Sequence, residues 1–132
     1  MNQEVLQAER IKIYEEFMVD FYQGLGQAIA AGRKKQTDNR VILEWAKRIR
    51  IFNAKCAMIG SDVVVRALIE YDKVAREAML AQDMSIVLAQ FAKVVVIMRK
   101  DLNPETKITG LEVLRTIVTD VDRQPKLLEL LS

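Results

Sequence analysis

A cluster of charged residues, Arg99, Lys100 and Asp101, follows directly after the five apolar residues 94–98. Two cations beside a carboxylate could bind a charged ligand, or they could form part of a catalytic site that uses a further buried acid. The alternative is structural, because Arg99 and Lys100 would fall in the last turn of a helix, where cations stabilise the negative end of the helix dipole. Asp101 is then close enough to pair with a neighbouring base. We favour the structural interpretation, which needs no ligand.

Two carboxylates further along the chain could extend this cluster. Asp120 and Asp122 are two residues apart, so on a helix they would point to different sides and would not converge on one metal ion without other ligands. Either could instead pair with Arg99 and hold two helices together. Such a partly buried ion pair would specify the packing of the helices more than it would stabilise it.

The residue types that are missing exclude several kinds of chemistry. The sequence contains no histidine and one cysteine, Cys56. It therefore cannot form a Ser–His–Asp or Cys–His triad, a histidine-ligated zinc site or a cage of several thiolates. Cys56 falls on an apolar stripe, which is typical of a small buried residue. We predict that the protein is not an enzyme and that it uses no metal ion and no cofactor.

The segment from Arg33 to Lys55 is basic, with eight basic residues against two acidic ones, whereas the whole chain has a net charge of +2. On a helix, several of these cations lie opposite an apolar stripe. A basic outer side can bind nucleic-acid phosphates or anionic lipids. The candidates for anion binding are Arg40, Lys47, Arg48 and Lys55. The alternative, which we favour, is the solvated side of an amphipathic helix that acidic helices of a partner could contact.

Composition and periodicity predict an all-α protein. The 132 residues are the usual size of one domain, and 51% of them are apolar, which is enough for a buried core. Five glycines and two prolines are too few for the many turns of a β-sandwich or barrel. We predict a bundle of four or five helices with a long N-terminal helix. The bundle forms a single domain over residues 1–132, in which 123–132 is a flexible or docking tail.

The first two helices are predicted on either side of a loop at residues 31–40. The first runs from near residue 3 to about residue 31, and Thr37 or Asp38 caps the second. Apolar residues spaced three and four apart define a buried stripe on each helix. The predicted stripes are Ile11, Tyr14, Met18, Phe21, Leu25 and Ala28 on the first helix, and Ile42, Trp45, Ile49, Phe52 and Cys56 on the second.

The third and fourth helices are predicted from their boundaries. Gly60 in the left-handed conformation would end the second helix, and Ser61 would cap the third. The fourth would begin at Asp83 or Ser85 and end before Pro104. Its "VVVIM" segment is apolar on every side, which places it at the centre of the bundle. A short strand is the alternative for this valine-rich segment.

The last part of the chain is predicted to contain a fifth helix and a tail. Thr109 begins the helix, and Glu112 three residues later completes a capping box. Apolar residues at helical spacing carry the predicted buried face as far as Val121. The tail "QPKLLELLS" restarts after Pro125 and holds four leucines in five positions.

Three segments together resemble a family of uncharacterised helical proteins from bacteria and their phages. They are "IGSDVVVRALIEY" at 59–71, "MRKDLN" at 98–103 and "GLEVLRTIVTD" at 110–120. Members share a hydrophobic–Gly–Ser–x–Glu–Val segment and, 30 to 40 residues on, an apolar run that ends in Arg–Lys–Asp–Leu. The sequence departs from this pattern at Val63, where an acidic residue is usual. The resemblance implies a helical domain and implies no activity.

The function we expect is a non-enzymatic interaction or oligomerisation module, whose partner is a second copy or another helical protein. Ile13, Leu43 and Ile51 lie off the predicted stripes and are candidates for a subunit interface. The alternative is an adaptor that binds nucleic acid or a membrane surface through the basic side of residues 33–55. The single cysteine and the absence of an apolar run of about 20 residues predict a soluble, cytoplasmic protein.

Overall fold

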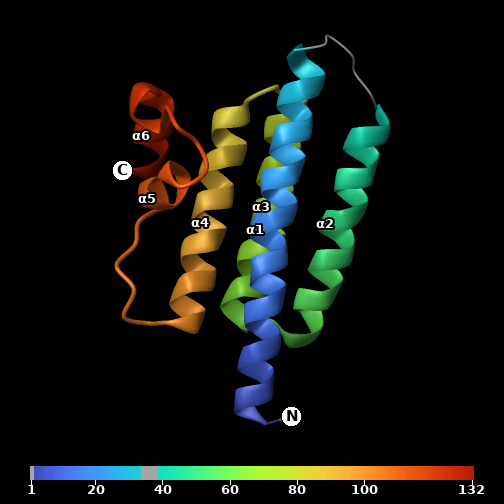
Figure 1. Ribbon diagram of the computed structural model, residues 1–132, viewed down its shortest axis with the longest axis vertical. Helices are drawn as coiled ribbons and strands as arrows, with labels where there is room; N and C mark the ends of the chain where they lie inside the picture. Colours follow the sequence, from blue (N-terminus) through green and yellow to red (C-terminus); the bar gives the residue numbers. More distant parts are fainter. Residues whose placement is uncertain (1, 34–38) are drawn as a thin grey trace. The chain divides into compact units, whose positions relative to one another are not determined.

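The computed structural model describes the backbone of residues 2–33 and 39–132, and the side chains of 2–24, 43–44 and 47–132. The described residues form helices and connecting turns and no strand, which confirms the predicted all-α bundle with its long N-terminal helix (Figure 1). Four helices are long: α1 (Gln3–Arg33), α2 (Asn39–Ile59), α3 (Asp62–Leu80) and α4 (Met84–Leu102). Three elements are short: α5 (Gly110–Arg115), the 3₁₀ turn η1 (Val121–Arg123) and α6 (Pro125–Leu131). The predicted caps Thr37 and Asp38 lie outside the described residues.

The chain divides into two compact units, an N-terminal unit of Met1–Gly60 and a C-terminal unit of Ser61–Ser132. The N-terminal unit contains α1 and α2, and the C-terminal unit contains all the other elements. The prediction that residues 1–132 form a single domain stays a prediction.

The N-terminal unit is an antiparallel hairpin of α1 and α2 (Figure 1). The rings of Phe17 and Phe52 stack across the hairpin with their centroids 5.1 Å apart. Nearer the start of α1, the Arg10 Nε donates a hydrogen bond of 2.7 Å to the carbonyl oxygen of Ile59. That oxygen belongs to the last turn of α2, where carbonyls have no partner within the helix. Apolar packing in the middle and a side-chain hydrogen bond at one end thus hold the two helices together.

The buried side of α1 differs from the predicted stripe. Tyr14 and Phe21 are buried as predicted, but Ile11 is exposed, and Ile13 and Phe17 are buried in its place. Ile13 is therefore not a candidate for a subunit interface, and that prediction is wrong. The physical reason is that apolar residues occur on all sides of α1, so spacing alone cannot select the buried side. The stacking of Phe17 on Phe52 fixes the rotation of the helix. Of the predicted stripe, Leu25 and Ala28 lie outside the described side chains.

Ser61 caps α3 as predicted, since its side-chain oxygen accepts a hydrogen bond of 3.4 Å from the Val64 N–H. The prediction of a left-handed Gly60 is wrong, because no described glycine has a positive φ. The Gly60 N–H donates to the carbonyl of Cys56 at 2.7 Å, so the helical hydrogen bonding of α2 continues to that residue. The chain then turns through the extended backbone of Ser61, at φ −68° and ψ 157°.

Among the described residues, the left-handed conformation occurs instead at Gln82, at φ 56°, between α3 and α4. The Asp83 N–H donates to the Ala78 carbonyl at 2.8 Å, and the Gln82 N–H donates to the Met79 carbonyl at 3.1 Å. This pair of hydrogen bonds is a Schellman motif, which satisfies the last carbonyls of α3. Asp83 then caps α4 by accepting from the Ile86 N–H at 3.4 Å, which confirms one of the two predicted starts.

The helix α4 forms the centre of the C-terminal unit, and α3, α5 and α6 pack against it (Figure 1). Its segment "VVVIM" is helical, so the alternative of a strand is wrong. The helix ends at Leu102, two residues before Pro104, as predicted. Helical spacing predicts an inward set of Val87, Leu88, Phe91, Val94, Val95 and Met98, and all six are buried, together with Ala89 and Ala92.

The helix α5 begins as predicted but ends early. Thr109 and Glu112 form the predicted capping box. The predicted continuation to Val121 is wrong, because α5 ends at Arg115 and the chain turns before η1. The next residues, "TIVT" at 116–119, are all β-branched and disfavour a helix. The Thr116 hydroxyl also donates to the Val113 carbonyl at 2.7 Å. This carbonyl of the last turn therefore has a hydrogen-bond donor without a continuing helix.

The tail at 123–132 docks on the C-terminal unit. Its helix α6 packs on α4 and α5, and Leu127 is fully buried. A Cβ atom added at Gly110, the first residue of α5, would lie 3.1 Å from Leu131 Cδ2, so α5 and α6 approach each other closely there. Pro125 occupies the first turn of α6, where the missing N–H costs nothing.

Removing the hydroxyl of Thr109 should destabilise the C-terminal unit. We expect Thr109→Ala to lower the free energy of unfolding by about 1 kcal/mol, because the side chain caps the N-terminus of α5. The measurement is chemical denaturation followed by circular dichroism. Thr109→Ser, which keeps the hydroxyl, is the control and should lose less than half as much. Equal losses in both variants would contradict a capping role.

Candidate functional site

The outer side of α2 carries a row of exposed apolar and basic residues, here called the α2 stripe. Its members are spaced so that they follow one side of the helix. They are Leu43, Lys47, Arg50, Ile51, Ala54 and Met58. The three large apolar side chains are strongly exposed: Leu43 by 67%, Ile51 by 50% and Met58 by 84%. Leu43 and Ile51, two of the three predicted interface candidates, are thus exposed.

The cations of α2 have different surroundings. Lys47, Arg48 and Arg50 are exposed, and among the described residues none of the three has an acidic partner. Lys55 instead pairs with Glu16 of α1, with its Nζ 3.2 Å from the Glu16 Oε2. Of the four predicted anion-binding residues, Lys47 and Arg48 thus lie open to solvent, Lys55 is occupied within the hairpin, and the side chain of Arg40 lies outside the described residues.

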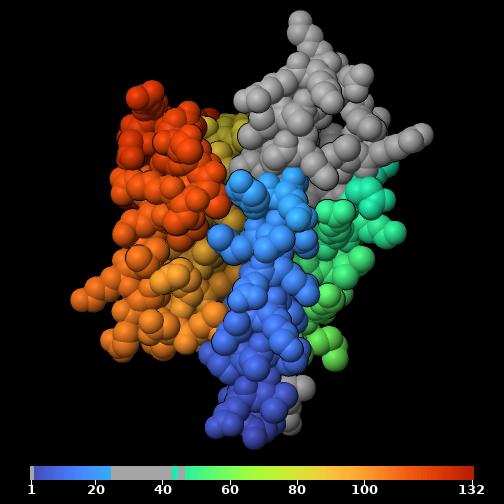
Figure 2. Space-filling view, viewed as in Figure 1, coloured from blue at the N-terminus to red at the C-terminus, as the bar shows by residue number. Residues whose placement is uncertain are grey.

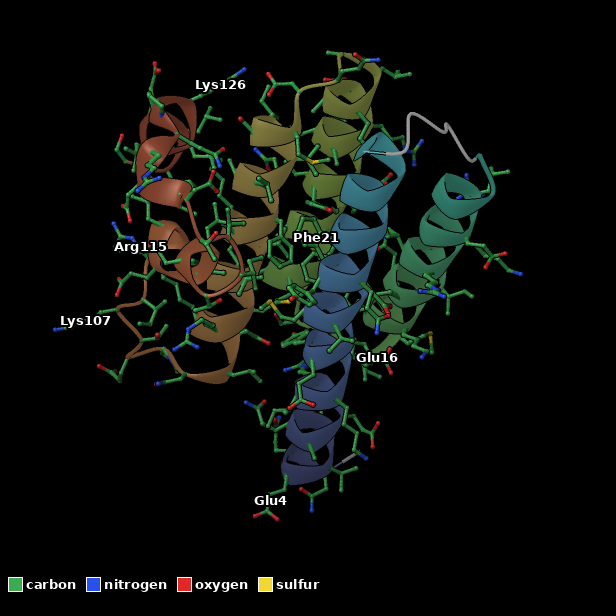
Figure 3. All side chains as sticks on the ribbon, turned by 45° about the horizontal axis from the view of Figure 1, so that its top comes forward. Glu4, Glu16, Phe21, Lys107, Arg115 and Lys126 are labelled. Carbon is green, nitrogen blue, oxygen red and sulfur yellow. The ribbon has the colours of Figure 1, made fainter. Side chains whose placement is uncertain are left out.

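The outer side of α1 carries a second row, here called the α1 stripe, which sequence reasoning missed. Its members follow the helix at spacings of three and four: Glu4, Ala8, Ile11, Glu15, Val19 and Tyr22. All six are exposed, and the large apolar ones are exposed by 43% at Ile11, 53% at Val19 and 59% at Tyr22. Figure 2 shows residues 2–24 as a continuous outer surface, and Figure 3 shows Glu4 projecting from the first turn. The charges of this stripe are acidic, opposite in sign to those of the α2 stripe.

Exposed apolar residues also occur on α3, but they do not form such a row. Val63 and Ile69 are both exposed and are six residues apart, which places them on different sides of the helix. Ile69 and Leu80 share a side, but they are eleven residues apart, and the exposed residues between them on that side, Lys73 and Arg76, are charged. The N-terminal unit therefore offers the better-defined candidate surface.

The cluster of Arg99, Lys100 and Asp101 lies at the end of α4, in the last turn where the sequence placed it. The Arg99 guanidinium donates to the Thr106 hydroxyl at 3.2 Å, and Thr106 in turn accepts from the Ile108 N–H at 3.4 Å. Arg99 therefore holds the connection between α4 and α5. Lys100 is exposed and Asp101 is half-buried. Lys107 in the same connection extends away from the ribbon (Figure 3).

The acids that could have joined this cluster have other partners. The Asp120 carboxylate accepts a hydrogen bond of 3.0 Å from the Gln124 side chain. The Asp122 carboxylate pairs with Arg115, with a shortest distance of 2.8 Å. The hydrogen bond to this carboxylate, and then its charge, raise the pKa of the Arg115 guanidinium. These contacts tie η1 to α5 and to the start of α6. The structure thus gives Arg99 and Asp120 different partners.

A further ion pair, between Lys126 and Asp83, joins α6 to the cap of α4. The hydrogen bond from Lys126 lowers the pKa of the Asp83 carboxyl, and the hydrogen bond from the Ile86 N–H acts in the same direction. Asp83 thus serves both as a helix cap and as the anchor of the tail.

Cys56 is fully buried in the N-terminal unit, as predicted. Burial, with a smaller contribution from the charge of Glu16, raises the pKa of its thiol from 9.0 to about 12. Because the thiolate is the reactive form, this environment suppresses nucleophilic chemistry at neutral pH.

Within the described parts of the chain, no group of three or more His, Cys, Asp and Glu side chains is arranged to hold a metal ion. No described helix is both long enough and apolar enough to cross a bilayer. No protein-family model, curated protein or solved structure matches this chain. The resemblance to uncharacterised bacterial and phage proteins stays a prediction.

The thiol of Cys56 should resist modification in the folded protein. A rise of the thiol pKa from 9.0 to about 12 lowers the thiolate fraction at pH 8 by about three orders of magnitude, and burial blocks access as well. We expect Ellman's reagent to react with the native protein at least about 10²-fold more slowly than with protein unfolded in guanidinium chloride. Similar rates in the two states would contradict the buried environment of Cys56.

Proposed function

We propose that this protein is a non-enzymatic interaction module that self-associates through its N-terminal unit. The observation that carries the proposal is the exposure of apolar side chains in rows on the outer sides of α1 and α2. Contiguous exposed apolar surface marks sites of protein interaction. Burial of one exposed Leu or Ile side chain contributes about 1.5–3 kcal/mol. Three large apolar side chains on each stripe therefore give a substantial driving force for association.

The chemistry of the side chains supports a role without catalysis. The sequence has no histidine, and its one cysteine is buried with a raised pKa. Arg99 at the end of α4 is engaged in holding a connection, which is a structural task. A cytoplasmic location is part of the proposal, and it is supported by the single cysteine, which fits a reducing compartment.

Self-association should appear in the solution mass. We expect light scattering to give a dimer or larger assembly for the full chain, because burial of the apolar side chains of the two stripes lowers the free energy. Deletion of residues 1–12 removes Glu4, Ala8 and Ile11 from the α1 stripe and should weaken association by about tenfold or more. Circular dichroism checks that the shortened chain remains helical. An unchanged monomer mass for the full chain at all accessible concentrations would refute the proposal.

The exposed cations of α2 favour a second candidate function, binding to an anionic surface of nucleic acid or membrane. Lys47, Arg48 and Arg50 are exposed and have no acidic partner among the described residues. Clustered cations of this kind attract phosphate groups through counterion release or through the surface potential of anionic lipids. The apolar residues between Lys47 and Met58 fit a protein partner better than a phosphate backbone, so this function stands second.

Charge reversal tests the second function. If it holds, Lys47→Glu with Arg48→Glu should abolish binding to duplex DNA or to phosphatidylserine vesicles, and raised salt should weaken wild-type binding steeply. The control is Arg66→Glu with Lys73→Glu on α3, which changes the net charge equally at exposed positions. Binding that neither salt nor the α2 reversal changes would exclude the basic side of α2 as the site.

A further inference from the structure

We propose that self-association joins the α1 stripe of one copy to the α2 stripe of a second copy. This inference rests on the proposed function and names its contact surfaces and its partner, which is the same chain. The contact is then heterotypic. Each molecule has one acidic apolar row and one basic apolar row, and the acidic row of one copy binds the basic row of another.

The signs of the charges select this pairing. The α1 stripe contains two acids, Glu4 and Glu15, and the exposed Lys12 borders it. The α2 stripe contains two bases, Lys47 and Arg50, and the exposed Glu44 borders it, so the first side is acidic and the second basic in net charge. Contact between two α1 stripes would bring carboxylates together, and contact between two α2 stripes would bring cations together. Like charges that face each other across an interface oppose association. Contact between an α1 stripe and an α2 stripe brings opposite charges together instead.

The spacing within the two rows matches as well. Glu15 has Ile11 four residues before it and Val19 four residues after it. Lys47 is flanked in the same way, by Leu43 four residues before it and Ile51 four residues after it. When Glu15 lies opposite Lys47, the flanking apolar residues therefore meet in pairs, whichever way the two helices run relative to each other. The charged pair sits between apolar contacts that shield it from water and salt.

The ion pairing within the hairpin does not involve Glu15, Lys47 or Arg50. Glu16 on α1 and Lys55 on α2 already pair with each other inside the N-terminal unit, with 3.2 Å between Nζ and Oε2. Among the described residues, Lys47 and Arg50 have no acidic partner, and Glu15 has no basic one. The fold thus uses one ion pair to close the hairpin and presents Glu15, Lys47 and Arg50 on its outer sides.

A mixing experiment with two reversed variants tests the heterotypic contact. The first variant, Glu4→Lys with Glu15→Lys, makes the α1 stripe basic like the α2 stripe. The second variant, Lys47→Glu with Arg50→Glu, makes the α2 stripe acidic like the α1 stripe. We expect each variant alone to associate at least about tenfold more weakly than the wild type, because like charges then meet. In an equimolar mixture the reversed rows complement each other, and association should return to within about tenfold of the wild type.

The readouts are analytical ultracentrifugation of each sample, and capture of one variant by an affinity-tagged copy of the other. The matched control is Glu70→Lys with Glu77→Lys on α3, which changes the net charge as the first variant does at exposed positions outside both stripes. It should associate as the wild type does. Circular dichroism and thermal unfolding establish that every variant is folded, since all of the changed side chains are exposed.

The results distinguish self-association itself from the contact between an α1 stripe and an α2 stripe. If the wild type is monomeric, both the proposed function and this inference are overturned. If the wild type associates and the stripe variants behave like the α3 control, the inference is overturned while self-association stands. If each variant alone is weakened but the mixture does not recover, contact between an α1 stripe and an α2 stripe is overturned. Recovery only in the mixture supports the inference.

Discussion

The structure of the N-terminal unit depends on one constraint: a helix that packs in a two-helix hairpin buries only part of its circumference. In α1 and α2 this buried part contains Phe17 stacked on Phe52, with Arg10 closing one end of the hairpin on the Ile59 carbonyl. Both helices nevertheless carry apolar residues on the opposite side as well. Those residues stay exposed because the hairpin has no further layer of its own to cover them. The exposed rows on α1 and α2, and the functions proposed from them, follow directly from this geometry.

The C-terminal unit shows how the same kind of helix behaves when more neighbours are present. There α4 is apolar on nearly every side, and α3, α5 and α6 all pack against it. The three short elements after α4 are held by polar contacts: the capping box of Thr109 and Glu112, the pair of Arg115 with Asp122, and Lys126 on Asp83. These contacts let short segments, which would not be stable helices by themselves, complete the cover of α4.

The sequence determined the parts of the fold that local chemistry controls. Ser61, Asp83 and Thr109 cap helices where their side chains and positions predicted, and Pro104 ends α4. The inward face of α4 was also predicted, because helical spacing placed Val87, Phe91 and Val94 on it and all three are buried. Two local predictions failed where a competing interaction was stronger. Gly60 continues the hydrogen bonding of α2, and the β-branched residues after Arg115 stop α5 early.

Only the tertiary structure decided which side of α1 is buried, and therefore which residues make up the candidate surface. Spacing selected Ile11 and set Ile13 outside, whereas the folded chain buries Ile13 and exposes Ile11. The physical reason is that the buried side of such a helix is the side whose side chains fit the volume and shape of the neighbouring helix best. On α2, the described side chains agree with the prediction, since Lys47, Arg48 and Lys55 are exposed and Phe52 and Cys56 are buried. On α1, where apolar residues surround the helix, its rotation is seen only in the contacts with α2, namely Phe17 on Phe52, Arg10 on the Ile59 carbonyl and Glu16 with Lys55. This rotation leaves Glu15 between Ile11 and Val19 on the exposed side.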